Sequence, residues 1–382
     1  MAIEDLKDQF SFPNDVAYLN TASFSPAFKS VEDAGIKAVQ LKSRPDFYQN
    51  SDLFEPVTKL RQLFANVIGA DDHNRIVTIP SVSYGTATVA NNITLQKGDE
   101  ILLIEEQFPS NVYTWRALAK TFDANIVTIK QPKTIADWNS EILKAINDKT
   151  AVVAMAHIHW ANGYIFDLKA IRSKTKQHNA LMIIDGSQSI GAFPFSIKDI
   201  QPDALICAGY KWLFGPYGCA YAYYSDYFDN GSPIEQNWTI RLNSENLAGL
   251  TKYQTAYKPL AQRYNAGESA SFIYVKMQTA ALKEILKIAP KELQDYCDSI
   301  SKDALEDLNA LGFISDDSEI RAKHLFGIKI PEIVDLEKLK HQLKSDNVIV
   351  SYRGDYIRIS CHVFNTRIHF NKLVESITKV VS

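Results

Sequence analysis

Residues 203–219 read DALICAGYKWLFGPYGC and place a lysine shortly after an apolar run that is typical of a buried strand. Lysine is among the residues least often buried unless another group pairs with it. A desolvated lysine amine has a lowered pKa and can form Schiff bases. The alternative is a surface lysine whose charged end reaches water. The role of Lys211 therefore has to be judged from the rest of the sequence.

Outward from this stretch, short apolar runs alternate with helical patterns. The apolar runs predict strands at 75–80, 100–105, 125–130, 151–158, 180–185, 203–208 and 219–224. The segments between them predict helices at 84–95, 110–122, 136–147 and 168–179. Continuous apolar strands separated by helices are typical of a sheet covered on both faces. We therefore expect an α/β fold with a mostly parallel, doubly wound sheet.

The pattern changes after about residue 265. Helices are expected at 271–289, 291–311, 335–347 and 367–381, and strands at 325–331, 348–354 and 356–361. This block has its own apolar periodicity and reads as α+β. The sequence predicts a large α/β domain at 16–262 and a smaller α+β domain at 263–382, with residues 1–15 packing on either one.

Composition limits the classes of function. The chain has 382 residues, a formal net charge of -3 and no cluster of Lys and Arg, so we expect no nucleic-acid partner. Its four cysteines are scattered without metal-ligand spacing or a disulfide framework. No apolar run approaches the length of a membrane span, and the N-terminus lacks an apolar signal region. We expect a soluble cytoplasmic protein without a metal or a membrane partner.

Polar or aromatic side chains follow several predicted strands. In open α/β sheets, ligands bind beyond the carboxyl ends of the strands. The residues that the sequence brings to this edge are Ser81, Ser83, Gln107, Phe108, His157, His159, Asn162, Asp185, Gln188 and Lys211.

Two of these positions have a specific chemistry and a simpler alternative. Ser83 lies in SVSYGT, between a strand and a helix, where hydroxyls and free backbone N–H groups suit a phosphate. The alternative is that Ser83 only caps the helix. Asp185 ends an apolar run, where burying a carboxylate costs free energy unless a cation or a protonated ring nitrogen pairs with it. The alternative is that Asp185 binds backbone amides of the next turn.

Together, Asp185, Gln188 three residues later and Lys211 before GPYG resemble the class V aminotransferase family. This family contains pyridoxal-phosphate enzymes of fold type I, including cysteine desulfurases and isopenicillin N epimerase-like proteins. The resemblance runs from YLNTASFSP (18–26) to RISCHVFNT (358–366). It implies the PLP-dependent transferase fold, with a large domain and a smaller C-terminal domain.

The resemblance also implies how pyridoxal 5'-phosphate is held. Lys211 matches the lysine that forms the Schiff base and moves the substrate's α-proton. Asp185 matches the partner of the ring N–H, and Gln188 the donor to the phenolic oxygen. The further cofactor contacts that it implies are Ser83, Tyr84, Phe108, His159, Trp160, Tyr210 and Ser269. Ser269 lies in RYNAGES (263–269), which resembles a loop that reaches the partner's phosphate in a homodimer.

On the substrate side, Arg358 matches the arginine that binds the carboxylate of an amino acid, and Arg353 is a nearby competitor. A guanidinium fork suits a carboxylate better than an ammonium does. The alternative is that Arg358 pairs with a local acid such as Asp355. Asn20 and Ala22 match the N-terminal stretch beside the substrate.

The reaction is less clearly indicated than the cofactor. A cysteine desulfurase of the usual kind needs a cysteine on the loop before the carboxylate arginine, and SYRGDYIR (351–358) has none. Cys361 reads instead as a core thiol. We expect an external aldimine with an amino acid and α-proton abstraction by Lys211, in an aminotransferase-like reaction. An amino-acid epimerase, a β-lyase that cleaves C–S bonds and a catalytically inactive PLP-binding partner protein are the alternatives.

Overall fold

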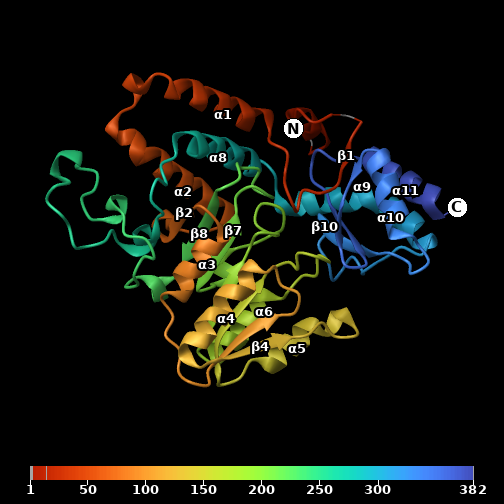
Figure 1. Cartoon of the computed structure of the whole chain (residues 1–382), viewed down its shortest axis with the longest axis horizontal. Helices are drawn as coiled ribbons and strands as arrows, with labels where there is room; N and C mark the ends of the chain where they lie inside the picture. The colour runs from red at the N-terminus through yellow and green to blue at the C-terminus, as the bar shows by residue number, and fades with distance from the viewer. Residues whose placement is uncertain (1–2, 14, 382) are drawn as a thin grey trace.

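The computed structural model describes residues 3–13 and 15–381. A seven-stranded sheet forms its centre (Figure 1). In spatial order its strands are β2 (Ile76–Ile79), β8 (Ala220–Tyr224), β7 (Ala204–Ala208), β6 (Leu181–Asp185), β5 (Thr150–Ala156), β3 (Glu100–Ile104) and β4 (Asn125–Ile129). In this sheet β8 runs antiparallel to both of its neighbours, β2 and β7, and the other pairs are parallel. The predicted strands and the mostly parallel sheet are therefore confirmed.

Both faces of this sheet are buried except at the edge strand β4, as the almost continuously apolar strands predict. Successive side chains of a strand point to opposite faces. Ile183 belongs to a core that contains Trp115 of α4 (Ser110–Phe122), whereas Ile184 belongs to a second core that contains Phe64 of α2 (Glu55–Ile68). The helices of this part are α1 (Lys29–Lys42), α2 (Glu55–Ile68), α3 (Val82–Ala90), α4 (Ser110–Phe122), α5 (Trp138–Ala145), α6 (Leu168–Gln177) and α7 (Ile197–Ile200). The doubly wound arrangement is confirmed.

Helix α3 differs from the prediction at both ends. It begins at Val82 because Ser81 caps it, its hydroxyl accepting a hydrogen bond from Tyr84 N at 3.1 Å. It ends at Ala90 rather than near residue 95. The Asn92 side chain, just beyond this end, donates to Thr88 O at 2.8 Å and to Ser232 O at 2.9 Å. These contacts join the end of the helix to a distant loop, which local periodicity does not reveal.

The C-terminal part contains an antiparallel sheet of four strands. In spatial order these are β12 (Ser351–Arg353), β13 (Tyr356–Ser360), β10 (Leu325–Lys329) and β9 (Ile314–Ser315). Its helices are α9 (Pro290–Ala310), α10 (Leu336–Ser345) and α11 (Arg367–Val381). The single strand predicted at 348–354 is instead divided, because β11 (Val348–Ile349) pairs with β1 (Ala17–Tyr18) while β12 pairs with β13.

Helix α8 (Phe272–Ile285) links the two parts. It follows the predicted boundary at residue 263, yet it packs against α1 and α2 beside the large sheet (Figure 1). The division into domains at 16–262 and 263–382 stays a prediction. Among the described residues, no helix combines the length and the apolar character needed to cross a lipid bilayer.

Candidate active site

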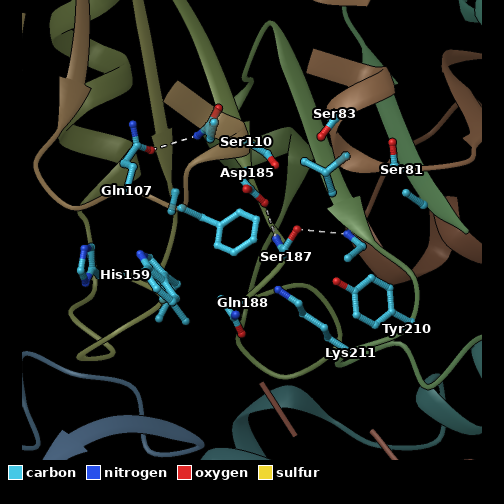
Figure 2. Close-up of a pocket in the computed structure, with 18 of the residues that line it drawn as sticks. Ser81, Ser83, Gln107, Ser110, His159, Asp185, Ser187, Gln188, Tyr210 and Lys211 are labelled. Atoms are coloured by element: carbon cyan, nitrogen blue, oxygen red, sulfur yellow. Dashed lines mark hydrogen bonds between the residues drawn. The ribbon is translucent and has the colours of Figure 1, made fainter. Parts of the chain in front are cut away.

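A cavity of about 260 Å³ lies at the carboxyl ends of β3, β5, β6 and β7 (Figure 2). Its wall contains most of the residues that the sequence assigned to the cofactor: Ser83, Phe108, His159, Trp160, Asp185, Gln188, Tyr210 and Lys211. Strand ends that are far apart in the sequence meet here because the parallel strands all end at one edge of the sheet.

Among the described residues that line the cavity, Lys211 is the one Lys or Arg side chain. Its side chain is 9% exposed and points into the cavity near Gln188 (Figure 2). The amine nitrogen lies 5.5 Å from the ring centroid of Phe108. The pKa of Lys211 is lowered to about 8, chiefly by burial; Asp185 raises it, and the charges of Arg358 and Arg353 add to the lowering. The amine is therefore partly neutral near neutral pH, and a neutral amine is nucleophilic.

The turn after β7 fixes the direction of Lys211. A Cβ atom at Gly209 would lie 2.9 Å from the carbonyl oxygen of Cys219, so only glycine allows this close approach to the start of β8. Lys211 O accepts a hydrogen bond from Phe214 N at 3.2 Å. Phe214 itself has a φ of 54°, a strained value for an aromatic residue. Its buried ring packs against Phe28, which helps to hold this turn in place.

Asp185 can serve both roles that the sequence left open, binding a backbone amide of the next turn and facing a ligand. Its Oδ1 accepts a hydrogen bond from Ser187 N at 2.9 Å, so it does hold the next turn. The Ser187 hydroxyl accepts from Ala208 N at 3.1 Å and thereby joins the ends of β6 and β7. Asp185 Oδ2 has no hydrogen-bond partner among the described residues, and Asp185 lines the cavity. One carboxylate oxygen therefore orients the residue and the other is available to a ligand.

Gln188 is held at both ends of its side-chain amide. Its Oε1 accepts from Trp212 Nε1 at 2.8 Å, and its Nε2 donates to Ala22 O at 3.2 Å. An amide nitrogen carries two hydrogens, so one donor remains. Ala22, which the sequence assigned to the substrate side, contacts the site through this bond.

Two serines and a tyrosine at the start of α3 have different roles in the structure. Ser81 is the N-cap, so capping is not the role of Ser83, which is exposed in the cavity wall. Tyr84 does not line the cavity, because its hydroxyl donates to Glu235 Oε2 at 3.1 Å. The free N–H groups at this helix end and the Ser83 hydroxyl give the cavity an end that favours anions.

Arg358 on β13 is 1% exposed, and among the described residues its side chain donates hydrogen bonds only to neutral oxygens. Its Nε donates to Ser351 Oγ at 3.0 Å, its Nη1 to Trp160 O at 3.0 Å and its Nη2 to Ser23 Oγ at 2.5 Å. No acid in the described part of the chain pairs with it, so the predicted alternative with Asp355 is not observed. Burial and Arg353 lower the pKa of Arg358 to about 9. Each terminal nitrogen carries two N–H groups and donates one of them here, so one N–H remains on each for a ligand.

The other predicted substrate residues surround Arg358. Asn20 Oδ1 accepts from the Ser23 hydroxyl at 2.8 Å, so it acts on Arg358 through Ser23. The guanidinium carbon of Arg353 lies 4.8 Å from the ring centroid of Trp160. Trp160 also donates from Nε1 to Glu106 O at 2.6 Å. Trp160, which lines the cavity, thus contacts Arg353 through its ring and Arg358 through its backbone oxygen.

His159 and Ser269 differ in their placement. His159 is 1% exposed, and its Nδ1 lies 3.0 Å from Asn162 Oδ1. Burial lowers the pKa of His159 to about 4, so its ring is neutral at neutral pH. Ser269 lies in the loop before α8 and does not line the cavity. Its predicted contact across a dimer interface stays a prediction.

Several residues that shape this site were not identified as site residues from the sequence. Ser187 joins two strand ends, and Ser23 and Ser351 orient Arg358. His324 contacts the backbone of Gln188 from the C-terminal part of the chain. Only Ser187 carried a local signal, since it lies between Asp185 and Gln188; the others depend on long-range packing.

Comparison with known families identifies the chain. The pattern described as aminotransferase class-V matches residues 18–370. The chain belongs to this family. Its members use pyridoxal phosphate, and the resemblance drawn from Asp185, Gln188 and Lys211 is confirmed.

Relatives within the class-V family have different descriptions. The chain is 25% identical over 386 aligned positions to an uncharacterized aminotransferase, YcbU, from Bacillus subtilis, with 98% of each chain covered. It is 29% identical to a probable cysteine desulfurase from Staphylococcus epidermidis over 53% of this chain and 46% of that protein. These relatives support an enzyme that acts on amino acids but differ in the reaction.

Solved structures share the fold. The apo cysteine desulfurase from Thermococcus onnurineus NA1 superposes with a TM-score of 0.85 at 20% identity, covering 99% of this chain and 98% of that one. A lysine-to-alanine mutant of C-DES, with glycine covalently linked to its PLP cofactor, has a TM-score of 0.87 at 19% identity, covering 98% and 99%. The predicted fold type I architecture is confirmed.

Proposed function

We propose that this protein transfers the amino group of an amino acid with the help of pyridoxal phosphate, and that Lys211 carries the cofactor. One observation carries the proposal: a buried amine with a pKa near 8 shares a cavity with Asp185 at the strand ends. A buried lysine that faces a carboxylate but does not bond to it is costly as a purely structural element. If the amine forms a covalent link with the cofactor, no free ammonium group is left buried, and that cost disappears.

The cavity offers a partner for each part of pyridoxal phosphate. The Ser83 hydroxyl and the start of α3 would hold the phosphate. Asp185 would pair with the ring nitrogen through its free oxygen, and Gln188 would donate its remaining amide hydrogen to the ring oxygen. The Phe108 ring, near the Lys211 amine, would stack on the cofactor ring. The residues present therefore fit the cofactor.

When bound, pyridoxal phosphate supplies a protonated ring that stabilises negative charge at the substrate's α-carbon. Arg358 binds the substrate carboxylate through its free Nη1 and Nη2 hydrogens and so orients the α-carbon. Lys211 Nζ would take the proton from the substrate's α-carbon and would later release it, and these are the two steps that amino transfer requires of this amine. A pKa near 8 suits both steps, because an acid–base catalyst works best near the ambient pH.

The proposal favours amino transfer over desulfuration because the chain offers no reactive thiol at the site. All four cysteines are buried. Cys219 lines the cavity, but burial raises its pKa to about 12, so its thiol is almost never ionised. The segment Ser351–Arg353 and the turn that follows it contain no cysteine. These observations favour proton chemistry at the α-carbon as the reaction.

The experiment is a product analysis with the loaded enzyme and a panel of amino acids. We expect one equivalent of keto acid per active site without an acceptor, and continued turnover only when a second keto acid is added. The enantiomer of the substrate would identify an epimerase. Ammonia or sulfide released with repeated turnover in the absence of an acceptor would identify a β-lyase. No product from any amino acid, with the cofactor bound, would favour the inactive partner protein and contradict the proposal.

We also propose that the protein is a homodimer with shared active sites. Ser269 lies outside the cavity of its own chain, as a residue that serves the partner would. Ile36 and Val39 on α1 are 51% and 54% exposed, and Phe24 stacks on Tyr217 at the surface. Such apolar surface is typical of an interface. Light scattering should give twice the chain mass of 43.0 kDa, and a monomer would contradict this part of the proposal.

A further inference from the structure

Gln188 is held through its backbone as well as through its side chain. Trp212 Nε1 donates to its side-chain oxygen at 2.8 Å. His324 Nε2 lies 2.9 Å from its backbone oxygen. Trp212 follows Lys211, whereas His324 directly precedes β10 in the C-terminal sheet. Two distant parts of the chain therefore meet at one residue of the cavity wall.

The hydrogen-bond network decides which nitrogen of His324 carries the proton. Gln294 Oε1 accepts from Lys323 N at 2.9 Å, which fixes the orientation of the Gln294 amide. Its Nε2 then lies 2.7 Å from both Ala192 O and His324 Nδ1. Since this nitrogen can only donate, His324 Nδ1 accepts and Nε2 carries the hydrogen. The hydrogen of His324 therefore points at Gln188 O.

The same histidine also supports Trp212. The two rings lie edge to face, with centroids 4.4 Å apart and an interplanar angle of 90°. Both side chains are fully buried. Burial lowers the pKa of His324 to about 4, so the ring stays neutral and keeps this proton arrangement. A small shift of His324 would move the backbone and the side chain of Gln188 together.

We propose that His324 is a positioning residue for the cofactor, which aims the free amide hydrogen of Gln188 into the cavity. His324 acts at the Gln188 backbone directly and at its side chain through Trp212. The inference rests on the proposed function, because that hydrogen has a purpose only when a ring oxygen lies opposite it. The C-terminal sheet thereby contributes to cofactor chemistry as well as to substrate binding by Arg358.

The test uses two amides that resemble different halves of the imidazole. In H324Q, the longer side chain places an N–H near the position of Nε2, so the donor to Gln188 O is kept. In H324N, the shorter side chain places its amide near the position of Nδ1, where its oxygen can still accept from Gln294, but it cannot reach Gln188 O. The pair is matched in polarity and differs in the contact under test.

The readout is the pH midpoint at which the visible absorption of the loaded enzyme changes. A hydrogen bond donated to an oxyanion favours its deprotonated form, so Q188A should raise this midpoint by roughly one unit. We expect H324N to raise it by at least half as much, H324Q to stay near the wild type, and H324N/Q188A to equal Q188A. A wild-type midpoint in H324N, or additive shifts in the double variant, would overturn the inference.

A second variant keeps the inference testable if H324N does not fold. W212F retains an aromatic ring against His324 but removes the donor to Gln188 Oε1, so it should shift the midpoint in the same direction as Q188A. An unchanged midpoint in W212F would then overturn the inference. If the wild type gives no visible band with pyridoxal phosphate, the proposed function itself fails, which is a different result from any of these shifts.

Discussion

One buried cation, Lys211, lines the cavity, and a second, Arg358 on β13, lies outside its lining; the protein stabilises them in different ways. At the sheet end, Lys211 lies 5.5 Å from the Phe108 ring centroid and has a pKa near 8. In the C-terminal sheet, Arg358 keeps its charge and donates hydrogen bonds to three neutral oxygens, one of them the backbone oxygen of the cavity residue Trp160. A lysine can lose its proton, whereas an arginine in practice cannot. The first arrangement suits a group that reacts, and the second suits a group that binds.

Replacing Lys211 should have the largest effect. K211A removes the amine that we propose links the cofactor and moves the proton, so activity should fall by about 10²- to 10⁴-fold or more. The visible band of the loaded protein should disappear, as absorption spectra would show. The matched control is K130A, at an exposed lysine away from the cavity. A visible band retained in K211A would show that Lys211 is not the lysine that reacts with the cofactor, and would contradict the difference drawn between Lys211 and Arg358.

Replacing Arg358 should affect the substrate and spare the cofactor. R358Q removes the charge that we propose binds the substrate carboxylate, and R358K keeps a positive charge without the guanidinium fork. Both should lower kcat/KM, R358Q by about 10²- to 10³-fold, because a buried charge pair loses one partner. The visible band should remain. R367Q is the control, since Arg367 forms an exposed pair with Asp303. Equal loss of the band in R358Q would mean that the two ends are not separate.

The pH dependence of cofactor capture should sharpen the contrast. Below about pH 8 the Lys211 amine is mostly protonated, so the rate at which the apo protein takes up pyridoxal phosphate should fall about tenfold per pH unit. Stopped-flow absorbance would measure this rate. Arg353 lowers the pKa of Lys211 and Asp185 raises it. R353Q should therefore move the midpoint up and D185N should move it down, by up to about one unit each. Shifts of the opposite sign would contradict the assigned environment of Lys211.

The smallest expected effects distinguish two serines at the same helix end. S81A removes the N-cap of α3 and should lower the free energy of unfolding by about 1 kcal/mol, as measured by denaturant titration. S83A should leave that free energy nearly unchanged and weaken cofactor binding instead. If S83A destabilises the protein as much as S81A, then Ser83 is a structural residue rather than a phosphate ligand.

The sheet end of the site could be predicted from the sequence because its signals are local. Asp185 and Lys211 each follow an apolar strand, and parallel strands end at the same edge. The helix predicted at 84–95 ends at Ala90 in the structure, and the side chain of Asn92 just beyond it is hydrogen-bonded to Ser232, far along the chain. Sequence periodicity carries no information about such a contact.

The C-terminal end could be predicted only in part. Arg358 was identified by resemblance, but its partners Ser23 and Ser351 come from segments more than 300 residues apart. His324 gave no signal at all, since its contact with Gln188 depends on how the two sheets pack. Residues that act through a neighbour leave little trace in one sequence.

Reduction of the loaded protein with borohydride, followed by peptide mass spectrometry, tests the central claim most directly. Reduction converts the link between lysine and cofactor into a stable secondary amine. We expect one modified residue, Lys211, within the peptide that contains AGYKWLFGPYG. A modified lysine elsewhere, or no modified lysine in a protein that binds pyridoxal phosphate, would contradict it.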